Sequence, residues 1–382
     1  MVKLADCGDT DLMGMRMRVL WLPVNIASQM QIVGNAMRDL GVDARGLVRD
    51  VSLSQSSESL ERYQGSPAEH RRYSPPWLWR HMVAAWRVVL AIRWADVVHY
   101  QYGGTRALPA GLGVVWTCAL RRPRLISFWG SDIRIPEFES RDNPYFARRD
   151  QTYAKWANAS YERSRRLQSY YARRGFTCVV GSETMLPHIQ PDLFPIHHLV
   201  RCAVDTRRLQ PLYPDPGRRE VVVVHSPSDP VAKGTQAVLS AVEALRCRDT
   251  PAFRLLLVTN VHRQQALDLL KTADIYLDQF VTSGYGMGAI EAMAMGKAVV
   301  SYISPPVAPL FPPDLPIVNA NQDNLADVLE ELLKDGRLRR ELGRRGRAYV
   351  EKYHDAHHIA RQLVAIYREL IAKNGGTLRR HR

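Results

Sequence analysis

The stretch "SGYGMGAIEAMAMGKAVVS" occupies residues 283–301 and combines three local patterns. Three glycines at alternate positions are followed by an apolar run that contains one carboxylate, Glu291, and ends at Gly296. A β-branched segment, 298–301, comes directly afterwards, and "DIYLDQ" precedes the glycines at 274–279. Glycine ends helices, and short Val/Ile runs form strands buried on both faces. We therefore predict a strand, a loop, a helix up to Gly296 and a second strand.

The same alternation of short apolar runs and helical patterns recurs along the whole chain. One series begins near Arg18 and ends with "FTCVVGS" at 176–182, and another restarts with "VVVVH" at 221–225. The Pro-rich segment "LQPLYPDPGRRE", 209–220, separates the two series. Strands that alternate with helices are typical of parallel sheets. We predict an α/β protein with two Rossmann-like, doubly wound parallel-sheet domains that face each other across a cleft.

The 382 residues are too many for one ordinary core and suit two domains of roughly 150–200 residues. The predicted order is a flexible N-terminal extension (1–16), an N-terminal Rossmann-like domain (17–202), a linker (203–219), a C-terminal Rossmann-like domain (220–355) and a C-terminal helix with a basic tail (356–382). Residues 48–75 lack periodicity and read as a long loop, either a lid or a disordered insertion. An arginine-rich helical region is expected at 148–174.

The charge and the cysteines limit the class of protein. A net charge of +14 with a pI near 9.7 indicates anionic partners, or an arginine-rich composition without a special partner. The five cysteines are odd in number and lack metal-ligand spacing, which favours a reduced, cytoplasmic protein without disulfides or zinc. No uninterrupted apolar run reaches the ~18 residues of a membrane-spanning helix.

Two segments of the second half have the properties of phosphate sites. In "HSPSDPVAKGTQ", 225–236, Lys233, Gly234 and Thr235 open a predicted helix, whose N-terminal amides and dipole attract anions. We expect Gly234 to let the backbone approach closely and Thr235 to cap the helix. The alternating glycines form a second such loop, with Glu291 expected in the first helical turn, where its carboxylate can accept two ribose hydroxyls. The alternatives are an ordinary capped helix and glycines required for packing.

Polar groups also follow two strands of the first half. "RLISFWGSDIR", 124–134, ends in Gly130, Ser131, Asp132 and Arg134, and "DVVHYQYGGT", 96–105, contains His99. In open α/β sheets ligands bind at the carboxyl ends of the strands. For His99 alone, we favour a structural, hydrogen-bonded role over acceptor binding.

Taken in order, these segments resemble the glycosyltransferase family-four group of GT-B enzymes. The resemblance rests on the Lys233 loop, on "CAVD" at 202–205, on the donor loop ending "EAMAMGKAVV", and on "FWGSDIR", and it covers roughly residues 90–370. It implies a retaining, metal-independent transferase of hexosyl or related groups from a nucleotide-diphosphate sugar, with no further cofactor. The N-terminal domain would bind the acceptor (a glycan, a lipid-linked or a small molecule) and the C-terminal domain the donor.

The resemblance implies roles for individual residues. Lys233 would bind the donor diphosphate, Glu291 the ribose, and the amides of 284–288 the sugar and phosphate; the predicted catalytic residues are Asp132, Lys233 and Glu291. The implied donor-binding set is Ser226, Ser228, Lys233, Gly234, Thr235, Asp278, Gln279, Ser283, Gly284, Tyr285, Gly286, Met287, Gly288 and Glu291. The implied acceptor-binding set is His99, Trp129, Gly130, Ser131, Asp132 and Arg134.

Three positions depart from the family pattern. Ser283 stands where the family has its first glutamate, although Asp278-Gln279 matches a related branch, and both versions stay open. Trp129 replaces the usual histidine of the first-domain segment, which leaves Asp132 as the candidate for that role. The arginine upstream of Lys233 is absent, so that Ser226 and Ser228, or a distant residue such as Arg201, would take its place.

The segment "PPWLWRHMVAAWRVVLAIRW", 75–94, is amphipathic and rich in Trp and Arg. It is either a peripheral contact with the inner face of a membrane or a core helix whose arginines reach water. Two competing functions also remain at this stage. One is a nucleic-acid-binding protein or DNA-modifying glycosyltransferase, which the charge suggests, and the other is a non-catalytic GT-B binding domain.

Overall fold

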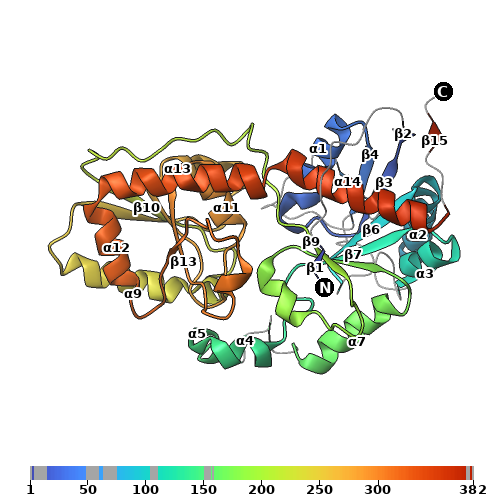
Figure 1. Ribbon diagram of the computed structural model, residues 1–382, viewed down its shortest axis with the longest axis horizontal. Helices are drawn as coiled ribbons and strands as arrows, with labels where there is room; N and C mark the ends of the chain where they lie inside the picture. Colours follow the sequence, from blue (N-terminus) through green and yellow to red (C-terminus); the bar gives the residue numbers. More distant parts are fainter. Residues whose placement is uncertain are drawn as a thin grey trace. The chain divides into compact units, whose positions relative to one another are not determined.

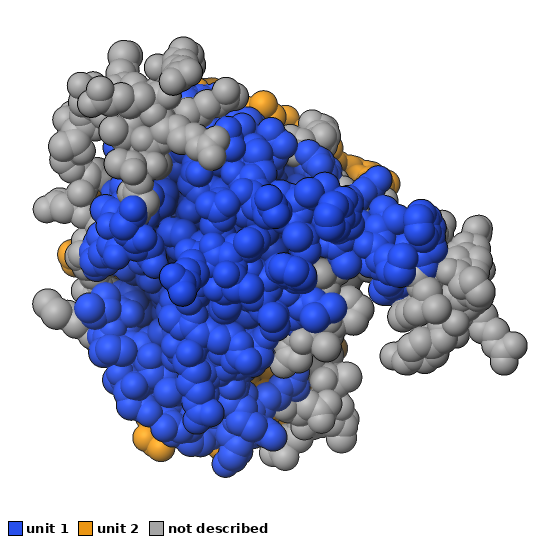
Figure 2. Space-filling model, turned by 90° about the vertical axis from the view of Figure 1, so that its right-hand side faces the viewer, with its two compact units in different colours: residues 1–134, 160–203, 356–382 blue, residues 135–159, 204–355 orange. Residues whose placement is uncertain are grey.

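The computed structural model describes residues 2–3, 15–48, 60–62, 75–103, 111–149, 156, 159–375 and 379–380. Within them the chain forms two compact units, coloured separately in Figure 2. Unit 1 contains the first part of the chain, residues 160–203 and the C-terminal segment from 356, and unit 2 contains 135–159 and 204–355. The predicted loop at 48–75 and the basic tail lie largely outside the described residues.

The described strands of unit 1 form one parallel sheet, ordered β1-β9-β8-β7-β6-β3-β4-β5. Their bounds are β1 Val2–Lys3, β3 Arg18–Leu22, β4 Asp43–Val48, β5 Glu61–Arg62, β6 Val97–Gln101, β7 Arg124–Phe128, β8 Thr177–Val180 and β9 His197–Leu199. The chain order reverses between β3 and β6, which is the switch point of a doubly wound sheet. A separate antiparallel pair joins β2 (Met15–Arg16) to β15 (Arg379–Arg380).

Helices cover both faces of this sheet (Figure 1). Successive strand residues point to opposite faces, so Leu20 and Leu22 join one hydrophobic cluster while Val19 and Trp21 join another. The first cluster includes α2 (Pro75–Trp94), α3 (Leu112–Ala119) and α7 (Tyr161–Ala172); the second includes α1 (Gln29–Asp39) and α14 (Ala356–Lys373). In the described part of the arginine-rich region, the helix spans Tyr161–Ala172, which is shorter than predicted. The turns η1 (Ile26–Ser28) and η3 (Glu183–His188) complete the unit.

The C-terminal helix α14 belongs to unit 1 and is not a separate appendage. The Tyr367 hydroxyl lies 2.9 Å from Trp21 Nε1 and 2.6 Å from His99 Nδ1, and all three side chains are buried. Buried polar groups need such partners. This network ties the end of the chain to β3 and β6 near the start of the unit, a long-range contact that local sequence patterns do not reveal.

Unit 2 has the same topology on a smaller scale. The parallel order is β11-β10-β12-β13-β14, with a switch point between β10 and β12. The strands are β10 Val221–His225, β11 Phe253–Leu257, β12 Ile275–Leu277, β13 Ala298–Ser301 and β14 Val318–Asn319. The helices are α8 Pro230–Lys233, α9 Thr235–Arg246, α10 Arg263–Lys271, α11 Met287–Ala294, α12 Leu325–Lys334 and α13 Gly336–Tyr353, with η4 at Ala308–Leu310. Two parallel-sheet α/β units are thus confirmed, together with the helix that stops before Gly296.

Two predicted boundaries are wrong. Residues 135–159 were assigned to the N-terminal domain, but α4 (Pro136–Asp142) and α5 (Pro144–Ala147) belong to unit 2. The Asn143 amide donates to the Val281 carbonyl (2.9 Å), and the Tyr145 hydroxyl donates to Asp323 (2.6 Å). These two hydrogen bonds tie the segment to unit 2.

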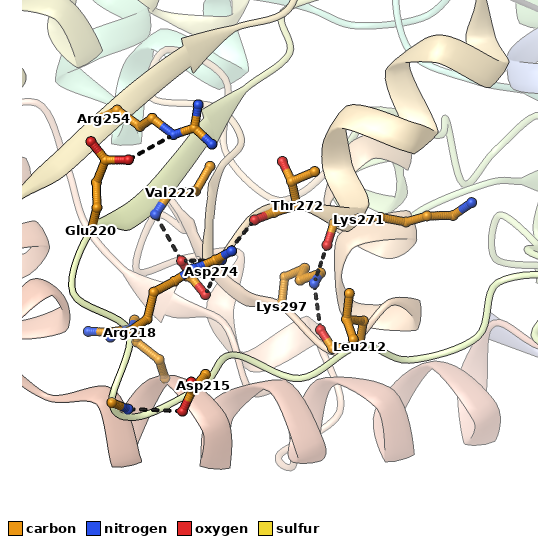
Figure 3. Close-up of polar contacts among 12 residues, drawn as sticks. Leu212, Asp215, Arg218, Glu220, Val222, Arg254, Lys271, Thr272, Asp274 and Lys297 are labelled. Atoms are coloured by element: carbon orange, nitrogen blue, oxygen red, sulfur yellow. Dashed lines mark hydrogen bonds and ion pairs between the residues drawn. The ribbon is translucent and has the colours of Figure 1, made fainter.

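The predicted linker is also part of unit 2 from residue 204 onward. Figure 3 shows Arg218 against the buried Asp274 (2.9 Å) and the buried Lys297 ammonium donating to the carbonyls of Leu212 and Lys271 (2.5 and 2.8 Å). These contacts anchor the extended segment along the unit. None of the helices in the described ranges combines the length and apolar content that crossing a membrane requires.

Candidate active site

The switch point of unit 2 brings together residues that are 45 and more positions apart in sequence. The loop after β10 leads to Lys233, and β12 is followed at once by Asp278 and Gln279. The ammonium of Lys233 donates to Asp278 Oδ1 (2.6 Å) and to Gln279 Oε1 (2.9 Å). An ammonium has three N–H donors, so these two bonds leave one for a ligand.

Asp278 links this lysine to the N-terminus of α11. Its second oxygen, Oδ2, accepts the backbone N–H of Gly286, the N-cap residue of that helix, at 2.6 Å. The carboxylate is fully buried and the lysine side chain is 15% exposed. One negative group therefore holds a cation and a helix start side by side, at the sheet edge where doubly wound folds bind ligands.

The Lys233 loop has a different helix start from the one predicted. Asp229 caps the short helix α8 by accepting the amide of Ala232 (3.0 Å), and Gly234 follows with a left-handed φ of +73°. Thr235 is the first residue of α9 and does not cap it; its hydroxyl lies 3.0 Å from Nε2 of the buried His225. The turn at Gly234 thus presents Lys233 between two helices, and Thr235 supports it from the core.

Glu291 is the fifth residue of α11, beyond the first turn in which it was expected. Its carboxylate forms an ion pair of 2.6 Å with Arg263, the first residue of α10, and both side chains are largely buried (10% and 21% exposed). Burial raises the pKa of Glu291, and the charge of Arg263 lowers it in part. The guanidinium therefore favours the ionised carboxylate, which is the form that accepts hydroxyl groups.

The alternating glycines have three separate functions. The amide of Gly284, whose φ is +97°, donates to the Tyr302 carbonyl, and the amide of Gly286 donates to Asp278. Gly288 is a packing residue, because a Cβ there would lie 2.0 Å from the hydroxyl of Tyr276. The alternative that the glycines are required for packing is therefore correct for Gly288. At Gly286 a Cβ would instead lie 2.7 Å from Nζ of Lys233, so a side chain there would crowd the lysine.

Other residues of the predicted donor set have structural partners. Ser283 is buried, and its hydroxyl accepts from the amide and hydroxyl of Ser304 (2.9 and 3.0 Å). The Tyr285 hydroxyl lies 3.1 Å from the Tyr349 hydroxyl and 3.1 Å from His354 Nε2. Ser226 is half-buried, Ser228 is exposed, and Met287 begins α11.

In unit 1 the structure changes the interpretation of the predicted acceptor residues. Asp132 is buried, and its two oxygens accept the amides of Trp129, Gly130 and Gly103 at 2.9–3.1 Å. Burial raises the pKa of Asp132, and the hydrogen bonds from these backbone amides lower it in part. A carboxylate bonded in this way orders the loop after β7, and a catalytic role for Asp132 stays a prediction.

Both ring nitrogens of His99, a predicted acceptor-binding residue, have hydrogen-bond partners inside unit 1. Its ring is buried, with Nδ1 2.6 Å from the Tyr367 hydroxyl and Nε2 2.7 Å from that of Ser127. Burial lowers its pKa from 6.5 to about 3, so the ring stays neutral. Trp129, Ser131 and Arg134 are half-buried at the ends of the strands. The Trp129 indole donates to Gln101 (2.8 Å), and the Ser131 hydroxyl lies 3.0 Å from that of Tyr102.

The sequence analysis missed two features. The first is Arg263, which belongs to no recognisable motif and is one arginine among many in the sequence. Arg201, which the sequence offered as a substitute arginine near Lys233, pairs with Glu183 of its own unit (2.6 Å). At the switch point of unit 1, the non-glycine residues Ala27, Ser28 and Tyr102 have positive φ (49°, 61° and 69°). Such backbone conformations are costly and concentrate at functional sites.

Comparison with known proteins agrees with this architecture. A glycosyl transferase-like family model matches residues 239–365. Among solved structures, sucrose-phosphate synthase from Thermosynechococcus elongatus superposes with a TM-score of 0.62 at 15% identity, covering 94% of this chain and 100% of that one. HepE of Anabaena, in complex with UDP and glucose, gives 0.61 at 13% identity over 93% and 100% of the chains.

The chain has the GT-B fold. A curated relative, the MMP α-(1→4)-mannosyltransferase of Mycolicibacterium hassiacum, is 29% identical over 207 residues. The match covers 46% of this chain and 49% of that protein, so the chain spans about half the length of this relative. The family-model match includes Asp278 and Glu291 but begins after Lys233. The switch point in this topology explains why Lys233, Asp278 and the N-terminus of α11 converge at one sheet edge.

Proposed function

We propose that the protein is a retaining glycosyltransferase that moves a hexosyl or related group from a nucleotide-diphosphate sugar to an acceptor hydroxyl. One observation carries the proposal: Lys233, Asp278 and the N-terminus of α11 meet at the switch point of unit 2 (2.6 Å for each contact of Asp278). A cation beside a helix N-terminus is suited to a diphosphate. The ion-paired Glu291 lies further along the same helix, where it can bind the ribose.

In this proposal the protein acts mainly by electrostatic stabilisation. The bond between the sugar C1 and the diphosphate oxygen breaks, and negative charge develops on that oxygen. The third N–H of Lys233 and the amides of α11 stabilise this charge, and no metal is required. The acceptor oxygen bonds to C1 on the same face, and its proton passes to the departing phosphate oxygen. Configuration at C1 is therefore retained.

Asp278 and Gln279, and not Ser283, would replace the family's first glutamate. The Ser283 hydroxyl is committed to Ser304, whereas Asp278 and Gln279 hold Lys233 directly. Both side chains would orient Lys233 toward the phosphate. We further propose that Trp129, Ser131 and Arg134 contact the acceptor, since they lie at the carboxyl ends of the unit 1 strands.

UDP is the first nucleotide to test, because the HepE structures contain UDP, UDP with glucose and UDP-glucose. The glycosyl transferase-like match supports a role in the synthesis of a glycan, glycolipid or glycosylated metabolite. The spacing of the cysteines supports a cytoplasmic location. The mannosyltransferase relative makes a hexosyl donor the natural starting point.

The test is thermal unfolding with UDP, GDP, TDP and ADP. A ligand at 100 times its Kd stabilises the folded state by about 2.7 kcal/mol, which is readily measured. We expect one nucleotide to raise Tm, the Lys233→Ala variant to lose at least about half of that shift, and the exposed-lysine control Lys334→Ala to keep it. Donor-hydrolysis assays with the matching nucleotide sugars then identify the sugar, and NMR of the product anomer tests retention.

Absence of any nucleotide shift would reject the donor site. Salt-sensitive binding of duplex DNA without a nucleotide shift would instead favour the nucleic-acid-binding alternative. Unchanged biological activity in both Lys233→Ala and Glu291→Ala would indicate a non-catalytic GT-B binding domain.

A further inference from the structure

The second helix of unit 1 exposes a hydrophobic face. Trp79, Met82, Trp86 and Leu90 are 46–65% exposed, and their spacing of three and four residues places them on one side of α2. The opposite side, with Ala84, Val88 and Ile92, is buried in the core cluster of the unit. The core-helix interpretation made from the sequence is therefore confirmed for one side of α2, and the other side is open.

Helix α3 extends this face. It packs against α2, and Figure 1 shows the two helices next to each other on one side of unit 1, the side that Figure 2 presents. Leu112, Val115 and Trp116 are 44–49% exposed on α3, while Val114 and Thr117 are buried. We call these seven exposed residues of the two helices the α2–α3 face. Clusters of exposed apolar side chains that include several tryptophans mark interaction sites.

The charged residues of the two helical segments have one sign. The segments 75–94 and 111–131 contain no Asp or Glu, whereas Arg87, Arg93, Arg121 and Arg122 lie on or beside the two helices. Arg87, Arg93 and Arg121 are exposed. A partner that is apolar and negatively charged would complement such a surface, and an anionic lipid headgroup layer has both properties.

A hollow adjoins the face. A cavity of about 700 Å³ lies between α2 and β4, and its lining includes Arg87 and Leu90 of α2 together with Arg45 and Glu61. The Arg45 guanidinium stacks on Trp94, another lining residue, at 4.0 Å. Two guanidinium groups beside exposed apolar side chains can bind a phosphate head while apolar groups contact the chains below it.

We propose that the α2–α3 face docks unit 1 onto anionic phospholipid bilayers, with the exposed tryptophans at the interface and the arginines among the headgroup phosphates. Tryptophan is enriched at this depth of a bilayer, and each arginine near an anionic surface adds a favourable electrostatic contribution. This docking does not depend on sugar transfer, and it requires no helix that crosses the bilayer.

The test is co-sedimentation of the full chain with vesicles of phosphatidylcholine alone or with 30 mol% phosphatidylglycerol. We expect binding to the anionic vesicles that weakens with salt. The double variant Trp86→Ser/Trp116→Ser should bind about tenfold or more weakly, and Arg87→Gln/Arg93→Gln about 25-fold more weakly, since each arginine contributes about fivefold. Trp86→Phe/Trp116→Phe should retain most of the binding.

The control is Leu239→Ser/Leu338→Ser, which removes two exposed apolar side chains of unit 2 and should not change vesicle binding. Thermal unfolding of each variant checks that it is folded. Three results would overturn the proposal: equal binding to both vesicle types, binding that the tryptophan variant does not change, or no binding by the parent protein. Loss of a dimer in sedimentation velocity, or of duplex DNA binding, in the tryptophan variant without vesicle binding would assign the face to another partner.

Discussion

The contact between Lys233 and Asp278 allows stability and ligand binding to be separated. Replacing Lys233 by alanine removes the charged partner of the fully buried Asp278 carboxylate. The hydrogen bond from the Gly286 backbone amide to Asp278 remains. Breaking a buried pair by removing one member costs about 3–5 kcal/mol. The lysine side chain is 15% exposed, and the hydrogen bond from the Gly286 amide persists. We therefore expect the unfolding free energy measured in urea to fall by the lower value, about 3 kcal/mol.

The same change removes one charged hydrogen bond to the donor diphosphate. Such a bond contributes about 1.5–3 kcal/mol, so UDP affinity should fall roughly 10- to 150-fold in isothermal titration. The double variant Lys233→Ala/Asp278→Asn removes the unpaired charge as well. It should regain about 2 kcal/mol of stability, since the buried negative charge is gone, and still bind UDP at least about tenfold more weakly than the parent.

Two outcomes would refute this reasoning. Unchanged UDP affinity in Lys233→Ala would show that the lysine does not contact the diphosphate. A double variant no more stable than Lys233→Ala would show that the buried carboxylate is not the cause of the stability loss. Lys334→Ala, which removes an exposed lysine paired with Glu330, controls for a general loss of positive charge.

Three further predictions concern unit 2. Arg263 partly offsets the raised pKa of Glu291, so Arg263→Ala should raise that pKa further. When the pH is lowered, UDP affinity should therefore begin to decline at a higher pH in the variant than in the parent. An unchanged pH profile in a variant with a normal Tm would contradict this. Burial lowers the pKa of Lys297 from 10.5 to about 8, so above pH 8 the folded protein loses a proton that the unfolded chain keeps. The unfolding free energy of the parent should therefore rise by up to about 3 kcal/mol between pH 8 and 10.5 relative to Lys297→Met, as measured by urea titration; parallel curves would argue against it. Gly288→Ala should destabilise the protein by about 1–3 kcal/mol, because its Cβ would overlap the Tyr276 hydroxyl. Gly288→Ala/Tyr276→Phe should recover only part of the lost stability in thermal unfolding, because the ring carbon Cζ would still lie 2.8 Å from that Cβ.

The local patterns of the sequence determined the fold class and most of its elements. Buried Val/Ile runs such as 221–225 and 298–301 coincide with β10 and β13, because a parallel strand covered on both faces must be apolar throughout. The glycine at 296 ends α11 in a left-handed turn at φ +73°, as its position in the sequence indicated. The resemblance to GT-B enzymes then gave the residues Lys233 and Glu291.

The tertiary structure decided which side chains are available. His99 and Ser283 resemble ligands in the sequence, but the structure places partners for both in the core, on Tyr367 and Ser304. A hydrogen-bond partner far away in the chain, such as Tyr367 for His99, leaves no local trace. For the same reason residues 135–159 were assigned to the wrong domain, and the C-terminal helix was predicted as a separate segment.

The pairing of Arg263 with Glu291 and of Lys233 with Asp278 likewise depends on the meeting of α10 with α11 and of β10 with β12. The sequence by itself determined the secondary structure, through the periodicity of its apolar residues, and the chemical groups present. Only the packing of helices and strands within each unit determined which of those groups are buried, which are paired, and which remain open to a ligand. The physical reason is that burial and charge pairing are set by distances between segments that the chain order does not specify.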